Sequence, residues 1–367
     1  MKVRIYGAGS IGNHLANGCR NRGWDVEMSD LDEAALARTK TDIYPARYGK
    51  WDEGIRLTPV SKLSYKQALD LVIIGTPPGS HFDIAMKALK KNPPKALLIE
   101  KPLCPPDLRN AEKLLKKAKD AGTILLVGYN HVMTKNTVKA AEFISAGALG
   151  LPQAIHVQWL EHWGGIFGAH PWLAGPWDSY LGFSERGGGS CGEHSHAINI
   201  WQHMASLLGA GRITTVQAMM DMVDDGQCKY DRTAMLQVQT DKGLAGTIIQ
   251  DVVTEPSVKS LRIQGTQGFM SWHDNYAKGQ DALIVGKNKE PEQILTFAKT
   301  RPDDFAGEIE EVGRIVETGS SAGSPIAIER GLDTMMVIAA AYRSHAKKRA
   351  MEIHYEEGYS LKAIRSK

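Results

Sequence analysis

The chain has 367 residues, 43% of them hydrophobic and 23% charged, with 44 basic and 41 acidic side chains and a net charge of +3. This length exceeds what one hydrophobic core usually supports, so we expect two domains. The balanced charge gives no support for nucleic-acid or membrane-surface binding, and no apolar run approaches the roughly 20 residues that span a bilayer. The N-terminus lacks the pattern of a signal peptide and the four cysteines form no CxxC pair, which predicts reduced thiols and a cytoplasmic protein.

The chain opens with a pattern that is typical of a dinucleotide-binding unit. A short strand over residues 2–6, the glycine run GAGSIG, a helix over residues 13–22 and a second strand over residues 24–29 follow in that order. The glycines permit a tight turn, the approach of a pyrophosphate to the backbone, and close packing of helix on strand. The pyrophosphate would then meet the positive end of the helix. The predicted cofactor-binding residues of the turn are Gly7, Gly9, Ser10, Ile11 and Gly12.

An acidic residue, Asp30, ends the second predicted strand. At about this distance from a glycine turn, a carboxylate accepts hydrogen bonds from the ribose hydroxyls of NAD and repels the 2′-phosphate of NADP. Asp32 could share this role, while Arg38 is the residue that could argue for NADP. We therefore expect NAD as the cofactor and keep NADP as the alternative.

Further strand and helix patterns continue to residue 128. A Pro-Pro-Gly turn follows the strand at residues 70–75 and would lie along the cofactor, although an ordinary loop explains it equally well. Repeated units of this kind predict an α/β Rossmann domain with a doubly wound parallel sheet over residues 1–128. The turn contributes the predicted cofactor-binding residues Thr76, Pro77, Pro78 and His81.

The pattern changes after residue 128. A helix over residues 135–146 precedes long alternating strands at residues 154–161, 213–223, 234–240, 244–252, 261–265 and 268–272, and residues 351–354 could add a last strand. Long alternating strands joined by short turns predict an α+β domain over residues 129–367 with a large, mainly antiparallel open sheet. A helix near residues 326–343 could pack between the two domains.

The sequence resembles one family along nearly its whole length: the glucose-fructose oxidoreductases, inositol dehydrogenases and rhizopine-catabolism oxidoreductases (Gfo/Idh/MocA). The most specific match is Glu100-Lys101-Pro102, which follows the apolar run at residues 96–99. The other matching motifs are the glycine run, Ile73-Ile74-Gly75-Thr76-Pro77-Pro78, Gly128-Tyr129-Asn130, Arg186-Gly187-Gly188-Gly189 and Glu329-Arg330-Gly331-Leu332.

The resemblance implies an NAD(P)-dependent dehydrogenase that transfers a hydride between a nicotinamide and a sugar, inositol or sugar-nucleotide carbon. Lys101 would lie near the reacting hydroxyl, and Glu100 and Asn130 near the cofactor. The sheet of the second domain often forms a dimer interface in this family. We therefore expect a homodimer or homotetramer that acts on a small sugar or polyol.

Oxidation of a secondary alcohol needs a base for the hydroxyl proton and a positive group beside the developing alkoxide. Lys101 could supply the positive group and His196 the base, with Glu193 orienting the histidine from one helical turn away. The segment that carries Glu193 and His196 is one residue shorter than the family pattern. His194 therefore stays open as the proton-transfer residue, and Asn199 takes the place of the second family acid.

Tryptophans and histidines gather between residues 159 and 203, where residues 162–180 predict a long loop. Tryptophan faces pack on the C–H faces of sugar rings, while polar side chains bond to the hydroxyls. The alternative is that these tryptophans pack the loop or form an interface. The predicted substrate-binding residues are Lys101, Tyr129, His162, Trp163, Trp172, Trp177, His194, His196 and Asn199.

Three other functions stay open from the sequence. Some proteins of this fold hold NAD tightly and cleave glycosidic bonds through a transient oxidation. A metal-dependent hydrolase could use His194, His196, His203 and Glu193, but the dinucleotide pattern leaves little need for a metal, and we predict none. A non-catalytic NAD(P) sensor is disfavoured because Lys101 and His196 are present.

Overall fold

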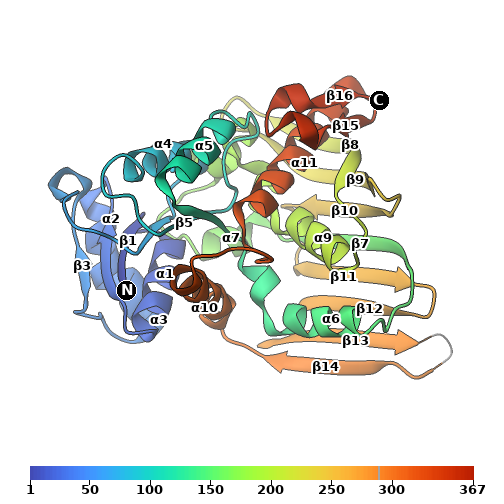
Figure 1. Ribbon diagram of the computed structural model, residues 1–367, viewed down its shortest axis with the longest axis horizontal. Helices are drawn as coiled ribbons and strands as arrows, with labels where there is room; N and C mark the ends of the chain where they lie inside the picture. The colour runs from blue at the N-terminus through green and yellow to red at the C-terminus, as the bar shows by residue number, and fades with distance from the viewer. Residues whose placement is uncertain (288–289) are drawn as a thin grey trace. The chain divides into compact units, whose positions relative to one another are not determined.

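In a computed structural model that describes every residue except 288–289, the chain forms two compact units (Figure 1). The first comprises Met1–Leu103, Asn110–Asn130 and Arg301–Ile328, and the second comprises Cys104–Arg109, His131–Thr300 and Glu329–Lys367. A single division after residue 128 stays a prediction of the sequence. In the structure, each unit also includes a segment from the other side of that position.

A six-stranded parallel sheet forms the centre of the first unit, which confirms the predicted doubly wound Rossmann fold. The strand order β3-β2-β1-β4-β5-β6 reverses its direction of growth between β1 and β4, where such sheets bind their ligands. The inner strands β4 and β5 are buried along their whole length, as their continuous apolar sequences require. The strands are β1 (Lys2–Tyr6), β2 (Asp25–Ser29), β3 (Ile55–Leu57), β4 (Leu71–Ile74), β5 (Ala96–Glu100) and β6 (Ile124–Gly128).

Helices pack on both faces of this sheet, with α1 against α10 and α4 against α5 (Figure 1). Helix α5 begins at Ala111, because Leu108 and Asn110 before it have positive φ angles and cannot belong to a helix. The helices are α1 (Ser10–Asn21), α2 (Glu33–Arg38), the π-helix η1 (Thr39–Ile43), α3 (Tyr44–Tyr48), the 3₁₀ turn η2 (Val60–Lys62), α4 (Pro78–Ala88), α5 (Ala111–Ala121) and α10 (Asp303–Thr318).

Helix α10 is the main element of the first unit that we did not predict. Its buried apolar residues Phe305, Ile309, Val312 and Val316 recur every three or four positions, which is the spacing of one helical face. The signal was therefore present in the sequence. The helix lies far along the chain from the Rossmann units that it joins.

The second unit contains a ten-stranded sheet in the order β14-β13-β12-β11-β7-β10-β9-β8-β15-β16. All its neighbouring pairs are antiparallel except β7 and β10, so the predicted mainly antiparallel sheet is confirmed. Strands β13, β14 and β16 were not predicted. The strands are β7 (Pro152–Leu160), β8 (Ile213–Asp224), β9 (Lys229–Thr240), β10 (Ala245–Asp251), β11 (Val258–Gly265), β12 (Gly268–Ala277), β13 (Gln280–Lys287), β14 (Gln293–Ala298), β15 (Met351–Ile353) and β16 (Ile364–Ser366).

Three long helices cover one face of this sheet (Figure 1). Helix α6 (Lys135–Ser145) packs on β12 and β13, and α9 (His196–Leu207) packs on β7 and β10. At the C-terminal end of α11 (Ile328–Lys347), Ser344 and His345 accept hydrogen bonds from the backbone of β8. The remaining helices and 3₁₀ turns are η3 (Asn130–Met133), α7 (Trp163–Gly168), η4 (Pro176–Asp178), η5 (Tyr180–Gly182), η6 (Ser184–Arg186), α8 (Gly189–Glu193), η7 (Tyr355–Glu357) and η8 (Leu361–Ala363).

The opposite face of the sheet carries exposed apolar side chains. Met219 on β8 and Met235 on β9 are direct neighbours across the two strands and are 65% and 46% exposed. Ile294 on β14 is also exposed. No helix among the described residues is both long enough and apolar enough to span a membrane.

Candidate functional site

The glycine turn between β1 and α1 has the geometry of a nucleotide-binding loop. Gly7 has a φ of +107°, and a Cβ atom there would lie 2.5 Å from the carbonyl oxygen of Gly75. A Cβ atom at Gly12 would lie 2.0 Å from the carbonyl oxygen of Gly7, whereas one at Gly9 would meet nothing within 4 Å. Gly7 and Gly12 are therefore needed by the fold, while Gly9 leaves open space in front of the turn.

Positive charge gathers at the beginning of helix α1. The Arg47 guanidinium donates to the carbonyl oxygen and to Oγ of Ser10, both at 2.7 Å. Burial, together with the charges of Arg47 and Arg301, lowers the pKa of His14 to about 3. Two guanidinium groups thus act on the end of the helix where its dipole is positive, an arrangement that suits a pyrophosphate. The sequence carries no recognisable motif around Arg47, and we did not predict its place here.

Asp30, which follows β2, hydrogen-bonds to the backbone of the glycine turn. Its Oδ2 accepts a hydrogen bond from the Ala8 N–H at 2.7 Å, and its Oδ1 accepts one from the Asp32 N–H at 3.0 Å. Each carboxylate oxygen keeps a lone pair for a ribose hydroxyl. Asp32 caps helix α2, and its carboxylate lies 3.5 Å from Arg38. The Asp32 carboxylate therefore offsets the charge of Arg38, the residue that would have to bind the 2′-phosphate of NADP.

The turn after β4 contains one residue whose role differs from the prediction. His81 is completely buried, with Nε2 2.6 Å from the carbonyl oxygen of Thr76 and Nδ1 3.2 Å from that of Leu103. Burial lowers the pKa of His81 to about 4, so the ring is neutral at neutral pH. The side chain ties the turn to the loop after Lys101 and is not exposed to a ligand. Pro78 is likewise buried as the first residue of α4, while Thr76 and Pro77 remain accessible.

Glu100 and Lys101 lie where β5 ends, as predicted. The Glu100 carboxylate fits a slot between two glycines, since a Cβ atom at Gly128 would lie 2.4 Å from Oε1 and one at Gly75 would lie 3.7 Å from Cγ. Oε2 accepts a hydrogen bond from the Lys101 N–H at 3.3 Å. Burial raises the pKa of Glu100 to about 7, against the opposing effect of the Lys101 charge. Lys101 itself is partly exposed.

Two predicted residues that follow β6 are buried in the first unit. Tyr129 has no exposed surface, and Asn130 is 4% exposed. Asn130 begins the 3₁₀ turn η3.

Asp231, which the sequence did not single out, organises the glycine-rich loop of the second unit. This fully buried carboxylate accepts hydrogen bonds from the hydroxyls of Ser184 and Ser190 at 2.6 and 2.7 Å, and from the Cys191 N–H at 2.7 Å. The Tyr342 hydroxyl donates a fourth at 2.5 Å. Gly189 has a φ of +74°, and a Cβ atom there would lie 1.9 Å from Oδ1 of Asp231. Asp231 therefore explains why a glycine is needed at position 189 of the glycine run.

The two candidate histidines do not lie on one continuous helix. Helix α8 ends at Glu193, and α9 begins at His196. Glu193 and His196 therefore do not lie one turn apart on the same helix, and that prediction is wrong. The break occurs where His194 has φ −94° and ψ 24° and its carbonyl accepts a hydrogen bond from Gln250. His194 is 2% exposed, whereas His196 is partly exposed.

The ring of His196 is held by two aromatic neighbours that we did not predict as site residues. It stacks on Trp159 with a centroid distance of 5.6 Å and an interplanar angle of 20°. His131 meets it edge-on at 4.6 Å. Asn199, one turn along α9, is buried and donates to Thr334 Oγ1 at 3.3 Å. Asn199 thus joins α9 to α11 and does not extend a row of exposed polar residues.

The aromatic segment after β7 divides into packing and exposed residues. The Trp163 indole donates to the Tyr230 hydroxyl at 3.3 Å and packs on a cluster that contains Ile166 and Val252. His162 caps α7 by accepting the Gly164 N–H. Trp172 is partly buried, and Trp177 is 51% exposed.

A cavity of about 620 Å³ lies elsewhere in the second unit, and none of the predicted substrate residues line it. Four of its lining residues are basic and two are acidic. They are Pro106, Asp107, Arg109, Ser184, Glu185, Arg186, Met222, Lys229, Ala339, Tyr342, Arg343 and Leu361.

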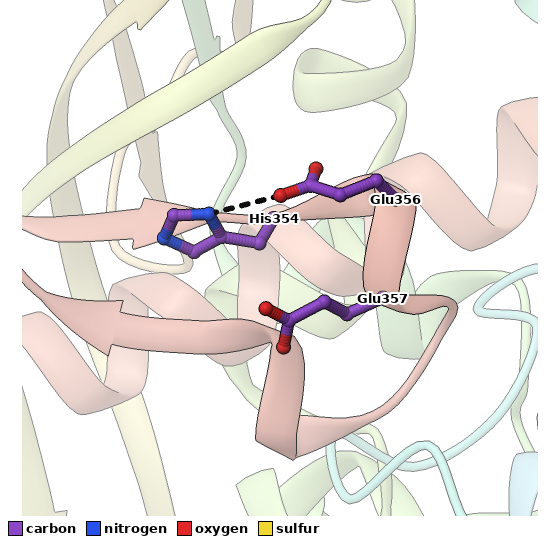
Figure 2. A group of neighbouring side chains, drawn as sticks. All are labelled: His354, Glu356 and Glu357. Atoms are coloured by element: carbon purple, nitrogen blue, oxygen red, sulfur yellow. Dashed lines mark hydrogen bonds and ion pairs between the residues drawn. The ribbon is translucent and has the colours of Figure 1, made fainter.

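One surface group has the composition of a metal site, but one of its carboxylates has a partner outside the group. Potential ligand atoms of His354, Glu356 and Glu357 lie within 4.8 Å of one another (Figure 2). His354 Nδ1 lies 3.2 Å from Glu356, and Arg365 donates to both oxygens of Glu357. Arg365 lies outside the group, so one of the group's two carboxylates already has a cationic partner.

Two family models match the chain. The oxidoreductase family model GFO_IDH_MocA, with an NAD-binding Rossmann fold, matches residues 1–129. The GFO/IDH/MocA C-terminal domain model matches residues 137–271. No curated protein sequence matches the chain.

Solved structures share the fold over nearly the full length. The chain is 17% identical to an aldose-aldose oxidoreductase from Caulobacter crescentus complexed with glycerol, with a TM-score of 0.75 and coverage of 96% of this chain and 99% of that one. An Agrobacterium radiobacter oxidoreductase in complex with NAD+, L-tartaric acid and magnesium is 17% identical, with a TM-score of 0.74 and coverage of 96% and 98%. An inositol dehydrogenase homolog from Azotobacter vinelandii, complexed with NADH and myo-inositol, is 16% identical, with a TM-score of 0.73 and coverage of 96% and 97%.

The residues of the first unit fit NAD. The open space before Gly9, the guanidiniums near the beginning of α1 and the carboxylate of Asp30 match the backbone, pyrophosphate and ribose needs of a dinucleotide.

Proposed function

Because the chain belongs to the Gfo/Idh/MocA family of NAD-binding oxidoreductases, we propose that it transfers a hydride between NAD and a secondary hydroxyl or ketone of a sugar, inositol or related polyol. The observation that carries this proposal is the lysine at the end of β5 in a unit built to hold NAD. The Azotobacter and Caulobacter structures support the substrate class, because they contain myo-inositol and glycerol.

We assign Lys101 to the reacting oxygen. NAD supplies the hydride acceptor when it is bound, and the alcohol oxygen then gains negative charge as its proton leaves. A lysine ammonium within hydrogen-bond reach stabilises that charge. The end of β5 holds Lys101 on a rigid strand of the sheet, with its backbone N–H fixed by Glu100.

We assign His196 as the proton-transfer residue in preference to His194. His196 is the more exposed of the two, and Trp159 and His131 fix the plane of its ring. A general base must reach the substrate oxygen in a defined orientation, which such packing supplies. His194 is buried beside the Gln250 contact, where a substrate would have to displace packed side chains.

The exposed aromatic residues after β7 are our candidates for the sugar-binding surface. Trp177 and Trp172 could cover the C–H face of a sugar ring, while His162 could bond to a hydroxyl. Trp163 is better explained as the residue that packs this segment on the sheet.

We further propose a homodimer or homotetramer assembled through the uncovered face of the ten-stranded sheet. Met219, Met235 and Ile294 give this face an apolar character that water does not favour. Replacement of both methionines by lysine should lower the oligomer mass measured by light scattering. An unchanged mass in a folded variant would remove this face from the proposal.

We also propose a cytoplasmic location. The four cysteines are all buried and none forms a disulfide, which suits a reducing compartment.

A substrate screen tests the proposed function. Sugars and inositols would be added to the protein with NAD, and both the unfolding temperature and the NADH absorbance would be recorded. A ligand of the native protein raises the unfolding temperature, and a substrate also yields NADH in proportion to ketone. Cleavage of a glycoside without net NADH would instead support the glycosidase that uses transient oxidation.

A further inference from the structure

Two buried carboxyl groups lie in the first unit, and only one of them belongs to the Glu-Lys-Pro motif. Glu100 is 6% exposed, and Glu308 on helix α10 has no exposed surface. Both carboxyl oxygens of Glu308 and Oε1 of Glu100 are buried without a hydrogen-bond partner among the described residues. Buried polar atoms nearly always have partners, so three such oxygens in one unit need an explanation.

The fold brings these two side chains to the same region. Helix α10 packs against α1 and β5, and Figure 1 shows α10 beside α1. Ile309, next to Glu308, fills the space above Gly18 of α1, where an added Cβ would lie 3.0 Å from its Cγ1. Glu308 itself lies in the interior, since it has no exposed surface, and its carboxyl interacts electrostatically with that of Glu100.

Few other charged or titratable groups face the pair. Lys101 and Arg301 act on Glu100, and the buried thiol of Cys19 on α1 faces Glu308. Arg301 already donates to Asp304 at 2.9 Å. Glu308 therefore has no cation of its own among the described residues, and a carboxylate buried in this way would be costly unless it is protonated.

We propose that Glu308 shares a proton with Glu100 and acts through it as a positioning residue for Lys101. A neutral carboxylic acid has an O–H donor, and the unpartnered oxygen of the other carboxyl is the acceptor that it needs. One shared proton gives two of the three oxygens a hydrogen-bond partner and avoids two buried negative charges in one region. The role at Lys101 rests on the proposed dehydrogenase function, whereas the shared proton does not.

The protonation state of the two carboxyl groups then sets the negative charge that acts on Lys101. Burial raises the pKa of Glu100 to about 7 and that of Glu308 well above its usual range. The pair passes from two protons to one near neutral pH, and the remaining proton stays between the two carboxyls at higher pH. The charge that faces the Lys101 ammonium is thereby set at a single negative unit.

Glu308→Gln tests the shared proton. The glutamine keeps the size of the side chain and donates an N–H to Glu100, so Glu100 should ionise at lower pH. We expect the infrared carbonyl band of a protonated carboxyl, which wild-type protein should retain above neutral pH, to vanish in the variant. The midpoint near pH 7 in the pH dependence of the catalytic rate should also move down by about one unit or more. The control is Glu310→Gln on the exposed side of α10, which should change neither readout.

The infrared band keeps the test independent of activity. If the screen finds no substrate but the band behaves as expected, the proposed function fails and the carboxyl pair stands. If folded Glu308→Gln keeps the wild-type band and midpoint, the pair is overturned. Should that variant not fold, wild-type protein without a protonated carboxyl band above neutral pH overturns the pair as well.

Discussion

The two units hold their proposed functional residues in different ways. In the first, Gly7, Asp30 and Lys101 follow strands β1, β2 and β5 of one parallel sheet, so the topology alone places them along the same edge of that sheet. In the second, His196 depends on a break between two helices, on a buried carboxylate and on two aromatic rings from distant segments. The first arrangement is fixed by backbone order and the second by side-chain packing. The first should therefore tolerate changes around it better than the second.

The largest expected effect comes from Lys101→Ala. Loss of the ammonium removes the charge that stabilises the developing alkoxide, and the catalytic rate should fall by roughly 10³-fold. NAD affinity, measured by titration calorimetry, should stay within about twofold because the glycine turn is untouched. The control is Lys87→Ala on the exposed side of α4. Near-native turnover by Lys101→Ala would defeat the assignment.

His196→Asn should lower kcat/KM by roughly 10²-fold to 10³-fold, since general acid–base groups contribute on this scale. His194→Asn should instead lower the unfolding temperature, because His194 is buried in the packing around Gln250. Steady-state kinetics and thermal unfolding of both variants separate the two assignments. The reverse result would transfer the proton-transfer role to His194.

Asp231→Asn tests whether packing fixes the second arrangement. The variant keeps the size of the side chain but cannot accept all four hydrogen bonds, and unpaired buried donors cost about 1–3 kcal/mol each. We expect a loss of about 2–3 kcal/mol in the free energy of unfolding, together with reduced activity. Asp221→Asn on the exposed part of β8 is the matched control, because its partner Arg232 is also at the surface. Equal stability of the two variants would show that the loop does not depend on Asp231.

These differences explain what the sequence could predict. Strand ends in a Rossmann sheet follow from local apolar runs and glycine positions, so Lys101 and the cofactor turn could be located before the structure was known. Asp231, His131 and Arg47 could not be found in this way, because their contacts come from segments far apart in the chain. Helix α10 had a clear apolar period, but nothing in its local sequence indicates that it returns to the first unit.

The stability of the first unit should depend on pH through Glu100. Burial raises its pKa from 4.5 to about 7, so the folded protein binds more protons than the unfolded chain between these values. The free energy of unfolding therefore falls as pH rises from 4.5 to about 7, by at most roughly 1.4 kcal/mol per pH unit, and it does not recover at higher pH. Urea unfolding at several pH values should show this slope, and Glu100→Gln should flatten it. A slope of the opposite sign would indicate that Glu100 is ionised in the folded protein.

The smallest expected effect concerns the exposed aromatic segment, where packing and binding can be distinguished. Trp177 is 51% exposed, so Trp177→Ala removes little buried contact and should leave the unfolding temperature unchanged. If its ring covers a sugar, KM should rise by several-fold, since an exposed stacking contact contributes about 1 kcal/mol. Trp163→Phe should instead lower the unfolding temperature and leave KM unchanged, because it loses the N–H donor to Tyr230 but no proposed substrate contact. An unchanged KM in Trp177→Ala would leave the aromatic segment with a packing role alone.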